Sequence, residues 1–307
     1  MLQMNSAHCY YAHMEFDDIR AFVAVVEAGS VSGAARELYV TQSAVTRRLQ
    51  RLEMAIGVTL LDRKTRPVSL TGPGRVVLER CRRLLNDFRE VRAAAANGHL
   101  PLEEVKIGVA HALTEITLTE PIEKVRQKFP RVALRFFTGW SHDLLERVRS
   151  GALDAAVILL AEGEKLPIGV SGTQIGKDRL LIVAARGPRS FRPRKMQDLS
   201  ETSWILNPEG CAARAALRRA LLRANIDMVV GVETYNYELQ LALVARNRGL
   251  SLVPERVLSR SRLKSSVRAL RFKGLNFPLT IWAVQRQSCT GLDAVIGELS
   301  LVLMQQL

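Results

Sequence analysis

Residues 30–57 constrain this chain most, because their pattern predicts two helices separated by a break of about three residues. Ser30 can cap the first helix, and Thr41 can cap the second. Gly57 is suited to end the second helix in a left-handed conformation. Small and apolar residues share one face of the first helix at Ala34, Ala35 and Leu38. In the second helix, apolar residues recur at spacings of four, three and four at Val45, Leu49, Leu52 and Ile56.

The opposite face of the second helix carries short polar and basic side chains. They are Gln42, Ser43, Thr46, Arg47, Arg48 and Arg51. Such side chains donate hydrogen bonds to base edges and phosphates, although a solvated amphipathic hairpin would show the same helical pattern. The following segment, residues 59–71, favours a DNA-reading helix. It predicts a β-wing with a basic tip at Arg63, Lys64, Arg66 and Pro67, and a return strand at residues 68–70.

Residues 21–71 resemble the winged helix-turn-helix of LysR-type transcriptional regulators. The resemblance rests on the alanine pair, the TQSAVT start of the second helix, the Leu52-Glu53 pair and the Leu70-Thr71 exit. Leu61 stands where the family usually has Phe, and residues 72–74 replace a more helical exit. The resemblance implies DNA contacts from Ser32, Thr41, Gln42, Ser43, Thr46, Arg47, Arg48, Arg51, Arg63, Lys64 and Arg66. In this scheme Gln42, Ser43 and Thr46 face bases, while Arg47 or Arg48 and the wing contact phosphates.

The charge of the chain agrees with a polyanionic partner. The net charge is +14, and residues 40–83 hold ten basic and three acidic residues, so +7 of that excess lies in this segment. The chain contains no long uninterrupted apolar run and no charged start followed by an apolar stretch. A cytoplasmic location with no membrane contact is therefore expected.

Metal, cofactor and catalytic motifs are not found. The four cysteines, Cys9, Cys81, Cys211 and Cys289, are expected to be free thiols because their spacing fits neither a metal site nor a disulfide framework. Residues 1–13 lack periodicity and are assigned no function, and the spacing of His8, Cys9 and His13 fits no recognised metal site. The sequence has no glycine-rich phosphate loop, GxSxG or paired-histidine motif. We therefore expect that the protein binds no cofactor and is not an enzyme.

Two further helices complete the expected head, residues 14–71, and its linker, residues 72–98. A helix at residues 16–27 is predicted to support the two DNA-reading helices. The linker helix carries apolar residues spaced four, three, four, three and four apart at Val77, Cys81, Leu84, Phe88, Val91 and Ala95. Such a seam needs a partner. It could pack on its own domain, but a long helix flanked by arginines is better suited to linking two chains as a dimer.

Beyond residue 101, strands alternate with helices, which predicts an α/β unit with a parallel, helix-covered sheet. The first set has strands at 105–109, 132–137 and 155–160 and helices at 113–128 and 142–149. The second set has strands at 179–185, 204–206, 229–233, 250–254, 267–272 and 279–284, with helices at 212–224, 237–247 and 292–304. Two similar sets suggest two subdomains. The expected fold class is thus α/β with an α-rich head.

This second region resembles the effector-binding domain of LysR-type regulators, which is built like a periplasmic solute-binding protein. Residues 151–154, GALD, and 249–254, GLSLVP, carry the resemblance. It implies an effector domain at 103–307, with subdomain I at 103–177 and 278–307 and subdomain II at 178–277. The chain would cross near residues 176–178 and 277–278. A solute-binding transport protein is the alternative of another class, but such proteins are exported and lack the head at residues 30–71.

The resemblance places an effector between the subdomains, where strands end and helix N-termini offer NH groups to an anion. The candidate contacts are His111, Leu113, Thr114, Trp140, Ser141, Asn207, Cys211, Arg214 and Thr234. Thr114, Ser141 and Asn236 could instead only cap helices, and His111 and His142 could be contacts or surface residues. His111 stands where family members often have an effector-touching Ser or Thr.

Two switches compete, namely a small, anionic effector and oxidation of Cys211. Cys211 precedes a helix and Arg214 follows one turn later, and both features favour a reactive thiolate. Peroxide-sensing members of the family carry a cysteine in a similar loop, but their resolving cysteine lies in the following helix. Residues 212–224 contain none, so the small effector is preferred. The resemblance further implies that the partner is promoter DNA and that a contact with RNA polymerase is possible. It also predicts a homodimer or a dimer of dimers, that is, a homotetramer.

Overall fold

The computed structural model describes residues 14–62, 65, 67–95, 104–187, 190–193, 195–287 and 292–307. Its chain divides into two compact units, Met1–Gly98 and His99–Leu307. Several sequence predictions lie outside the described residues. They concern the extension 1–13, the wing-tip residues Arg63, Lys64 and Arg66, the end of the linker at 96–98, and Cys289.

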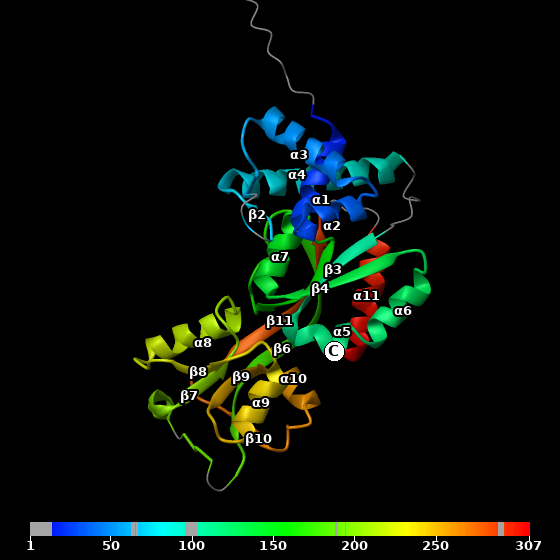
Figure 1. Cartoon of the computed structure of the whole chain (residues 1–307). Helices are drawn as coiled ribbons and strands as arrows, with labels where there is room; N and C mark the ends of the chain where they lie inside the picture. The colour runs from blue at the N-terminus through cyan, green and yellow to red at the C-terminus, as the bar shows by residue number, and fades with distance from the viewer. Residues whose placement is uncertain are drawn as a thin grey trace, which may run out of the picture. The chain divides into compact units, whose positions relative to one another are not determined.

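The first unit is a small helical domain with a two-stranded wing. Its elements are α1 Phe16–Ala28, α2 Val31–Glu37, α3 Gln42–Ile56, β1 Leu61–Asp62, β2 Ser69–Leu70 and α4 Gly72–Ala95 (Figure 1). The predicted caps are confirmed. The Ser30 hydroxyl accepts a hydrogen bond from the Gly33 amide at 3.0 Å, and the Thr41 hydroxyl accepts one from the Ala44 amide at 3.2 Å. Gly57 ends α3 with φ 77°.

Burial explains the apolar pattern of the first three helices. Val45, Leu49 and Leu52 of α3 lie in one core with Phe22 of α1 and residues of α2. The neighbouring Glu53 faces the wing instead, and its carboxylate accepts hydrogen bonds from the Leu60 amide at 2.8 Å and the Leu61 amide at 3.4 Å. β1 and β2 then pair antiparallel. The Leu52-Glu53 pair therefore fixes α3 to the core on one side and to the wing on the other.

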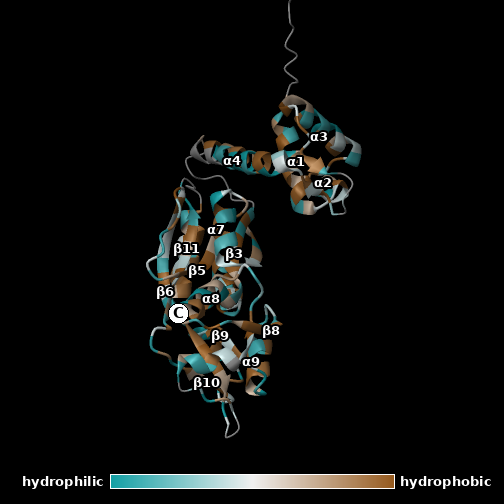
Figure 2. Cartoon of the chain, turned by 90° about the vertical axis from the view of Figure 1, so that its left-hand side faces the viewer, coloured by the Kyte–Doolittle hydropathy of each residue, from teal (hydrophilic) through white to brown (hydrophobic). Residues whose placement is uncertain are grey.

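The long helix α4 divides its apolar residues between two roles. Cys81 and Leu78 are buried in the core of the first unit, and Val77 packs against that core. The prediction of one continuous seam facing another chain is therefore wrong for Val77 and Cys81. Leu84 and Phe88 are each 45% exposed. Figure 2 shows hydrophobic and hydrophilic residues mixed along this helix.

The second unit contains one nine-stranded mixed sheet. Its strands are β3 Glu104–Ala110, β4 Ala133–Gly139, β5 Ala155–Ala161, β6 Val170–Ala185, β7 Ser203–Leu206, β8 Val229–Glu233, β9 Leu250–Pro254, β10 Val267–Leu270 and β11 Phe277–Arg286. The strand order is β4-β3-β5-β11-β6-β9-β7-β8, and β10 pairs with β6. Parallel pairing joins β3 to β4 and β5, and joins β7 to β8 and β9.

Helices cover this sheet. They are η1 His111–Leu113, α5 Thr114–Thr117, α6 Glu120–Lys128, α7 Ser141–Arg149, η2 Met196–Glu201, α8 Ala212–Arg223, α9 Tyr237–Ala245, α10 Glu255–Arg260 and α11 Asp293–Gln306. α6 and α11 lie side by side (Figure 1). The helix predicted at 113–128 is broken into η1, α5 and α6. Pro121 in the first turn of α6 accounts for the break, because its ring is accommodated at a helix start but not in a helix interior.

Two long strands run through both sites where the chain was expected to cross. β6 and β11 pair antiparallel along their length, with Leu279 opposite Asp178 and Pro278 opposite Arg179. The sequence predicted a parallel sheet and only the second half of β6. The first half of β6, residues 170–178, was missed because it alternates polar and small residues without a dense apolar run.

The buried side chains of this unit form separate cores. One cluster draws on residues 105–175 and 281–303, whereas two others draw on residues 180–270. We name the parts around these clusters the first lobe and the second lobe. β5 of the first lobe is hydrophobic along its length (Figure 2), as expected for a strand buried under helices.

The start of α4 provides a stability test. A Cβ atom at Gly74 would lie 2.0 Å from the carbonyl oxygen of Leu60, whereas one at Gly72 would meet nothing within 4 Å. We expect Gly74→Ala to destabilise the first unit by about 1–3 kcal/mol, because the backbone segments at Leu60 and Gly74 must move apart. Gly72→Ala should change the stability by less than about 0.5 kcal/mol. Urea unfolding of the full chain, followed by circular dichroism, compares the two. Equal midpoints would contradict the close packing of α4 on Leu60.

Candidate functional site

The first candidate site is the exposed face of α3 and the turn before it. Ser32, Thr41, Gln42, Ser43 and Arg47 are all exposed. The hydroxyls of Thr41 and Ser43 lie 3.0 Å apart, and the Thr46 hydroxyl donates to the Gln42 carbonyl at 2.9 Å. The side chains of Gln42 and Arg47 have no hydrogen-bond or ion-pair partner among the described residues. They are thus available to an external ligand.

Two other arginines of α3 are already paired within the unit. Arg48 contacts the carboxylate of Asp17 at 2.8 Å. Arg51 donates through Nη2 to Asp18 at 2.7 Å and to Glu15 at 3.1 Å. These pairs join α3 to α1, and the DNA contacts expected of Arg48 and Arg51 stay predictions. Of the predicted arginines on α3, Arg47 remains unpaired.

Asp18 is the central group of this arrangement. It is fully buried at 0% exposure, and its carboxylate accepts hydrogen bonds from Arg51 and from the Glu15 amide at 3.0 Å. The latter bond also caps α1. A buried carboxylate requires such partners because its desolvation is costly. Arg51 therefore sets the position of α3 on α1.

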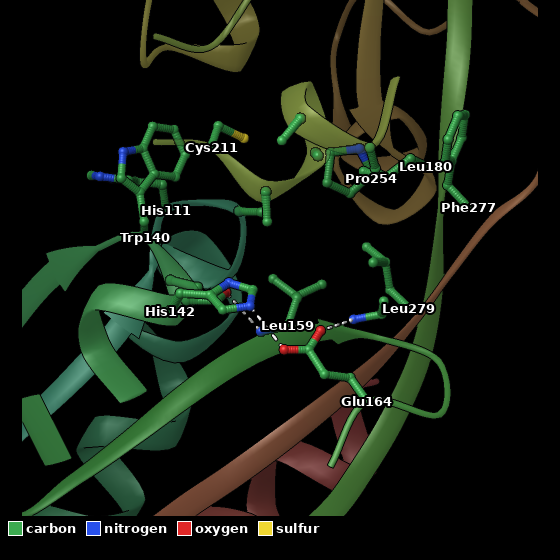
Figure 3. A pocket seen from close by; sticks show the side chains of 18 of the residues that line it. His111, Trp140, His142, Leu159, Glu164, Leu180, Cys211, Pro254, Phe277 and Leu279 are labelled. Atoms are coloured by element: carbon green, nitrogen blue, oxygen red, sulfur yellow. Dashed lines mark hydrogen bonds and ion pairs between the residues drawn. The ribbon is translucent and has the colours of Figure 1, made fainter. Parts of the chain in front are cut away.

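The second candidate site is a cavity of about 540 Å³ between the two lobes. Most of its wall is apolar, and its residues come from both lobes: Leu159, Leu180, Pro254, Phe277 and Leu279. Figure 3 shows Trp140, His111 and Cys211 toward one end of this cavity, with Leu180, Pro254 and Phe277 toward the other. Its size and lining are typical of small-molecule sites.

Aromatic side chains from the two lobes meet at one end of the cavity. His111 and Trp140 belong to the first lobe, and their ring centroids lie 5.0 Å apart. Tyr235 of the second lobe stacks on Trp140 at 5.5 Å and lies 5.5 Å from His111. Burial lowers the pKa of His111 from its ordinary value, which favours the neutral imidazole.

The sequence-predicted contacts are only partly brought together. His111, Trp140, Ser141 and Cys211 line the cavity. Leu113 is buried in the core of the first lobe. Thr114 lines a neighbouring cavity of about 340 Å³, which shares His111 and Tyr237 with the first. Asn207, Arg214 and Thr234 lie outside the linings of both cavities.

Asn207 and Thr234 belong to a buried polar network behind the cavity wall. Asn207 donates to the hydroxyl of Tyr237 at 2.9 Å and contacts the Cys211 sulfur at 3.7 Å. Gln240, at 0% exposure, donates to Asn207 and to the carbonyl of Thr234. Burial raises the pKa of Tyr237, so the phenol keeps its proton. This network fixes Cys211 and Tyr237, which do line the cavity.

Arg214 has a structural role that the sequence did not reveal. Its guanidinium bonds to Glu233 at 2.7 Å, to the Asn207 carbonyl at 3.1 Å and to Glu209 at 3.0 Å. The side chain is only 7% exposed. The effector contact expected of Arg214 stays a prediction, and in this structure the guanidinium is occupied by protein partners.

Sequence reasoning missed the charged residues that line the cavity. Glu162 is paired with Lys177 at 3.1 Å, Glu164 with His142 at 2.8 Å (Figure 3), and Glu209 with Arg218. Arg218 holds the pKa of Glu209 below its usual range. Arg219 lines the same cavity and has no partner among the described residues. Ala212, Ala215, Ala216 and Arg219 share one face of α8. Helical spacing could therefore have placed Arg219 on the same face as the start of the helix.

None of the described helices is long and apolar enough to cross a membrane. Nor does any group of three or more His, Cys, Asp or Glu side chains in these same parts of the chain form a plausible metal site.

A helix-turn-helix head joined to a two-lobed ligand-binding unit defines a class of DNA-binding regulators. Residues 16–75 match the model of the bacterial regulatory helix-turn-helix proteins of the lysR family, and residues 98–295 match the LysR substrate binding domain. The chain belongs to the LysR family of transcriptional regulators, as the sequence resemblance indicated.

Similar proteins agree with this family. The transcriptional regulator CzcR of Bacillus anthracis is 28% identical over 242 residues, which cover 79% of this chain and 81% of CzcR. GltR of Bacillus subtilis is 24% identical over 256 residues, which cover 83% of this chain and 85% of GltR.

Solved structures share the fold. A full-length OxyR variant from Pseudomonas aeruginosa has a TM-score of 0.73 at 20% identity, over 95% of this chain and 98% of that one. CbnR in complex with its target DNA has a TM-score of 0.56 at 21% identity, over 96% of this chain and 100% of that one.

The unpaired groups of α3 give a binding test. Gln42→Ala should weaken binding to a selected duplex by about 1–3 kcal/mol and relax its base preference, because an amide can read a base edge. Arg47→Ala should instead weaken all sequences alike and reduce the salt slope by about one unit. Titrations of selected and random duplexes at several salt concentrations separate the two. If Gln42→Ala lowered the affinity for both duplexes equally, the assignment of Gln42 to the groove would be wrong. The wing arginine Arg63 is predicted to behave like Arg47.

Proposed function

We propose that this LysR-type regulator is switched by a small effector with an apolar body and an anionic group, bound in the cavity between the lobes. The observation that carries this proposal is an unpaired arginine in the cavity. Glu162 and Glu209 are paired with Lys177 and Arg218, and Glu164 binds the His142 ring and the Ala161 amide, whereas Arg219 has no partner among the described residues. Arg219 is thus available as a counter-charge for an anionic ligand.

The first turn of α8 is also available to an anion. Cys211 is the N-cap of α8 and its side chain makes no capping hydrogen bond. Ala212 and Ala213 line the cavity at the same place. Backbone NH groups at a helix N-terminus bind anions because they lack intrahelical acceptors and the helix dipole is positive there. An effector carboxylate would meet these NH groups, while Leu159, Leu279 and Phe277 would contact its apolar body.

The placement of the cavity supports a change in lobe position on binding. We place the lobe boundaries at residues 177/178 and 277/278, where β6 and β11 pass from one lobe to the other as an antiparallel pair. Trp140 and Tyr235 stack across the lobes beside the cavity. A ligand that contacts both lobes would favour the arrangement in which its contacts are made, and so shift the population of states.

For the DNA-binding unit, we propose that Gln42 and Arg47 contact operator DNA together with the wing. Regulators of this family bind promoter DNA and form oligomers, and CbnR was solved with its target DNA. Two heads on one dimer would enter successive major grooves of a partly symmetric site. A contact with RNA polymerase belongs to the same proposal. The effector-dependent lobe arrangement would alter the angle between the heads.

Oxidation of Cys211 is the second candidate switch, favoured by its position at the cavity. The thiol is buried, 6% exposed, and contacts Asn207. The other described cysteine, Cys81, lies in the core of the first unit, where burial raises its pKa to about 11. Cys81 is therefore a protonated core residue at neutral pH and is ill suited to thiolate chemistry.

Arg219 tests the effector proposal against a matched control on the same helix. A library of small aromatic and aliphatic carboxylates should contain compounds that raise the melting temperature of the wild type. Arg219→Ala should lose most of this shift because the anion loses its counter-charge. Arg223→Ala, an exposed arginine of α8 away from the cavity, should keep it. A shift of equal size in both variants would remove Arg219 from the site.

Cys211→Ser separates the two switches, since it keeps the shape of the site and removes thiol oxidation. We expect the variant to retain its thermal shift with the stabilising carboxylate and its effector-dependent DNA binding. Treatment with peroxide should change neither wild-type nor variant DNA binding. A wild type switched by peroxide, beside a Cys211→Ser protein fixed in one state, would favour oxidation.

Assembly is tested on the exposed apolar part of α4. Leu84→Asp should yield monomers or aggregates with lost operator binding, because burying a carboxylate in an apolar interface costs several kcal/mol, roughly. Leu84→Met keeps the apolar surface and should remain dimeric in sedimentation velocity. A dimeric Leu84→Asp protein with normal DNA binding would exclude this helix from the dimer interface.

A further inference from the structure

The turn between α2 and α3 presents an unusual residue to solvent. Tyr39 is 96% exposed, and its backbone has φ 55°, in the left-handed region. Neither the core of the unit nor a polar network uses its side chain, because no hydrogen bond, ion pair or ring contact of Tyr39 occurs among the described residues.

The backbone around Tyr39 is a Schellman motif, a helix ending in which one residue takes the left-handed conformation. The Val40 amide donates to the Ala35 carbonyl at 3.0 Å, and the Tyr39 amide donates to the Arg36 carbonyl at 3.3 Å. Glycine is favoured at the left-handed position, and asparagine is next, because a Cβ atom there crowds the backbone. A large aromatic side chain at this position therefore does not stabilise the turn.

The same chain supplies an internal comparison. The non-glycine residues with positive φ in the described parts of the chain are Tyr39, Asn225 and Asn247. The endings at Asn225 and Asn247 repeat the pair of hydrogen bonds found at Tyr39. Ile226 and Asn225 donate to the carbonyls of Leu221 and Leu222, and Arg248 and Asn247 donate to those of Leu243 and Val244. Asparagine thus occupies the left-handed position at two helix ends of the second unit, whereas tyrosine occupies it at the end of α2, beside α3.

Tyr39 borders a shallow surface hollow at the start of α3. The hollow is also lined by Ser32, Arg36, Thr41 and Gln42. Arg36 is exposed and has no hydrogen-bond or ion-pair partner among the described residues. The hollow therefore adjoins the face on which Gln42 projects, and it offers one cation and several hydroxyl groups.

We propose that Tyr39 and Arg36 bind a phosphodiester of the DNA backbone beside the base pairs that α3 reads. The Tyr39 phenol donates a hydrogen bond to a phosphate oxygen, and the Arg36 guanidinium adds the counter-charge. This inference rests on the proposed DNA-binding face of α3. Backbone contacts of this kind set the register of a protein on the duplex without reading sequence. The unfavourable backbone conformation is kept because the phenol contacts DNA from this position.

Three variants separate stability from binding. Tyr39→Asn should raise the melting temperature of the first unit by a few degrees, roughly, because asparagine tolerates the left-handed region. It should also weaken binding about tenfold, the expected loss for one hydrogen bond to a charged group. Tyr39→Phe keeps the ring and the backbone strain, so it should lose binding equally without the gain in stability. Arg36→Ala should weaken binding and lower the salt slope by about one unit, whereas neither Tyr39 variant changes the slope because the phenol is neutral.

The measurements use the full-length protein with two probes, a duplex selected from a random pool and an unselected duplex of equal length. If Tyr39 and Arg36 contact a phosphate, their variants should lose affinity by the same factor for both duplexes. If Tyr39→Phe binds like the wild type, the hydroxyl makes no contact and the inference is overturned. Gln42→Ala and Arg47→Ala serve as references for the face of α3. Normal binding by the Tyr39 variants, with loss in both references, overturns only this inference, whereas normal binding by all of them overturns the proposed DNA-binding face as well.

Discussion

The DNA-binding unit depends on the buried carboxylate of Asp18. This carboxylate caps the start of α1 through the Glu15 amide and binds the guanidinium of Arg51 on α3. One group thereby fixes both the first helix and the angle at which the second DNA-reading helix leaves the core. Glu53 continues this arrangement on the other side of α3 by binding the amides at the start of the wing. These paired residues hold α3, so the exposed side chains of Gln42 and Arg47 project from it in a defined geometry.

The effector-binding unit depends in a similar way on one pair of strands. β6 and β11 are shared by both lobes, and their antiparallel pairing carries Leu180, Phe277 and Leu279 to the boundary where the cavity opens. Charge distribution then decides what the cavity suits. Arg214 and Arg218 pair with Glu209, and Glu164 binds the His142 ring, which leaves Arg219 and the first turn of α8 available to an anion. An apolar body with one acidic group matches this arrangement.

Local sequence signals predicted the helices and caps well. Ser30, Thr41 and Gly57 each act within three or four residues, and such signals are complete within a short window of sequence. The candidate site residues were predicted less evenly. His111, Trp140, Ser141 and Cys211 follow strand ends and line the cavity, but Leu159, Leu180 and Phe277 lie within strands. Their inward direction depends on the pairing of strands far apart in the sequence, so periodicity alone does not separate them from ordinary core residues.

The sequence by itself determined the helix-turn-helix, the wing and the alternation of strands and helices, because capping groups and apolar periods act between near neighbours. Only the tertiary structure decided which charged groups are available to ligands. Arg47, Arg48 and Arg51 lie on the same helix, yet contacts with Asp17 and Asp18, some thirty residues earlier, leave only Arg47 of the three without a partner among the described residues. Arg214 and Arg219 differ for the same reason, since the acids that neutralise Arg214 come from other segments. Long-range pairing depends on how the chain packs, and packing is not encoded in any short window of residues.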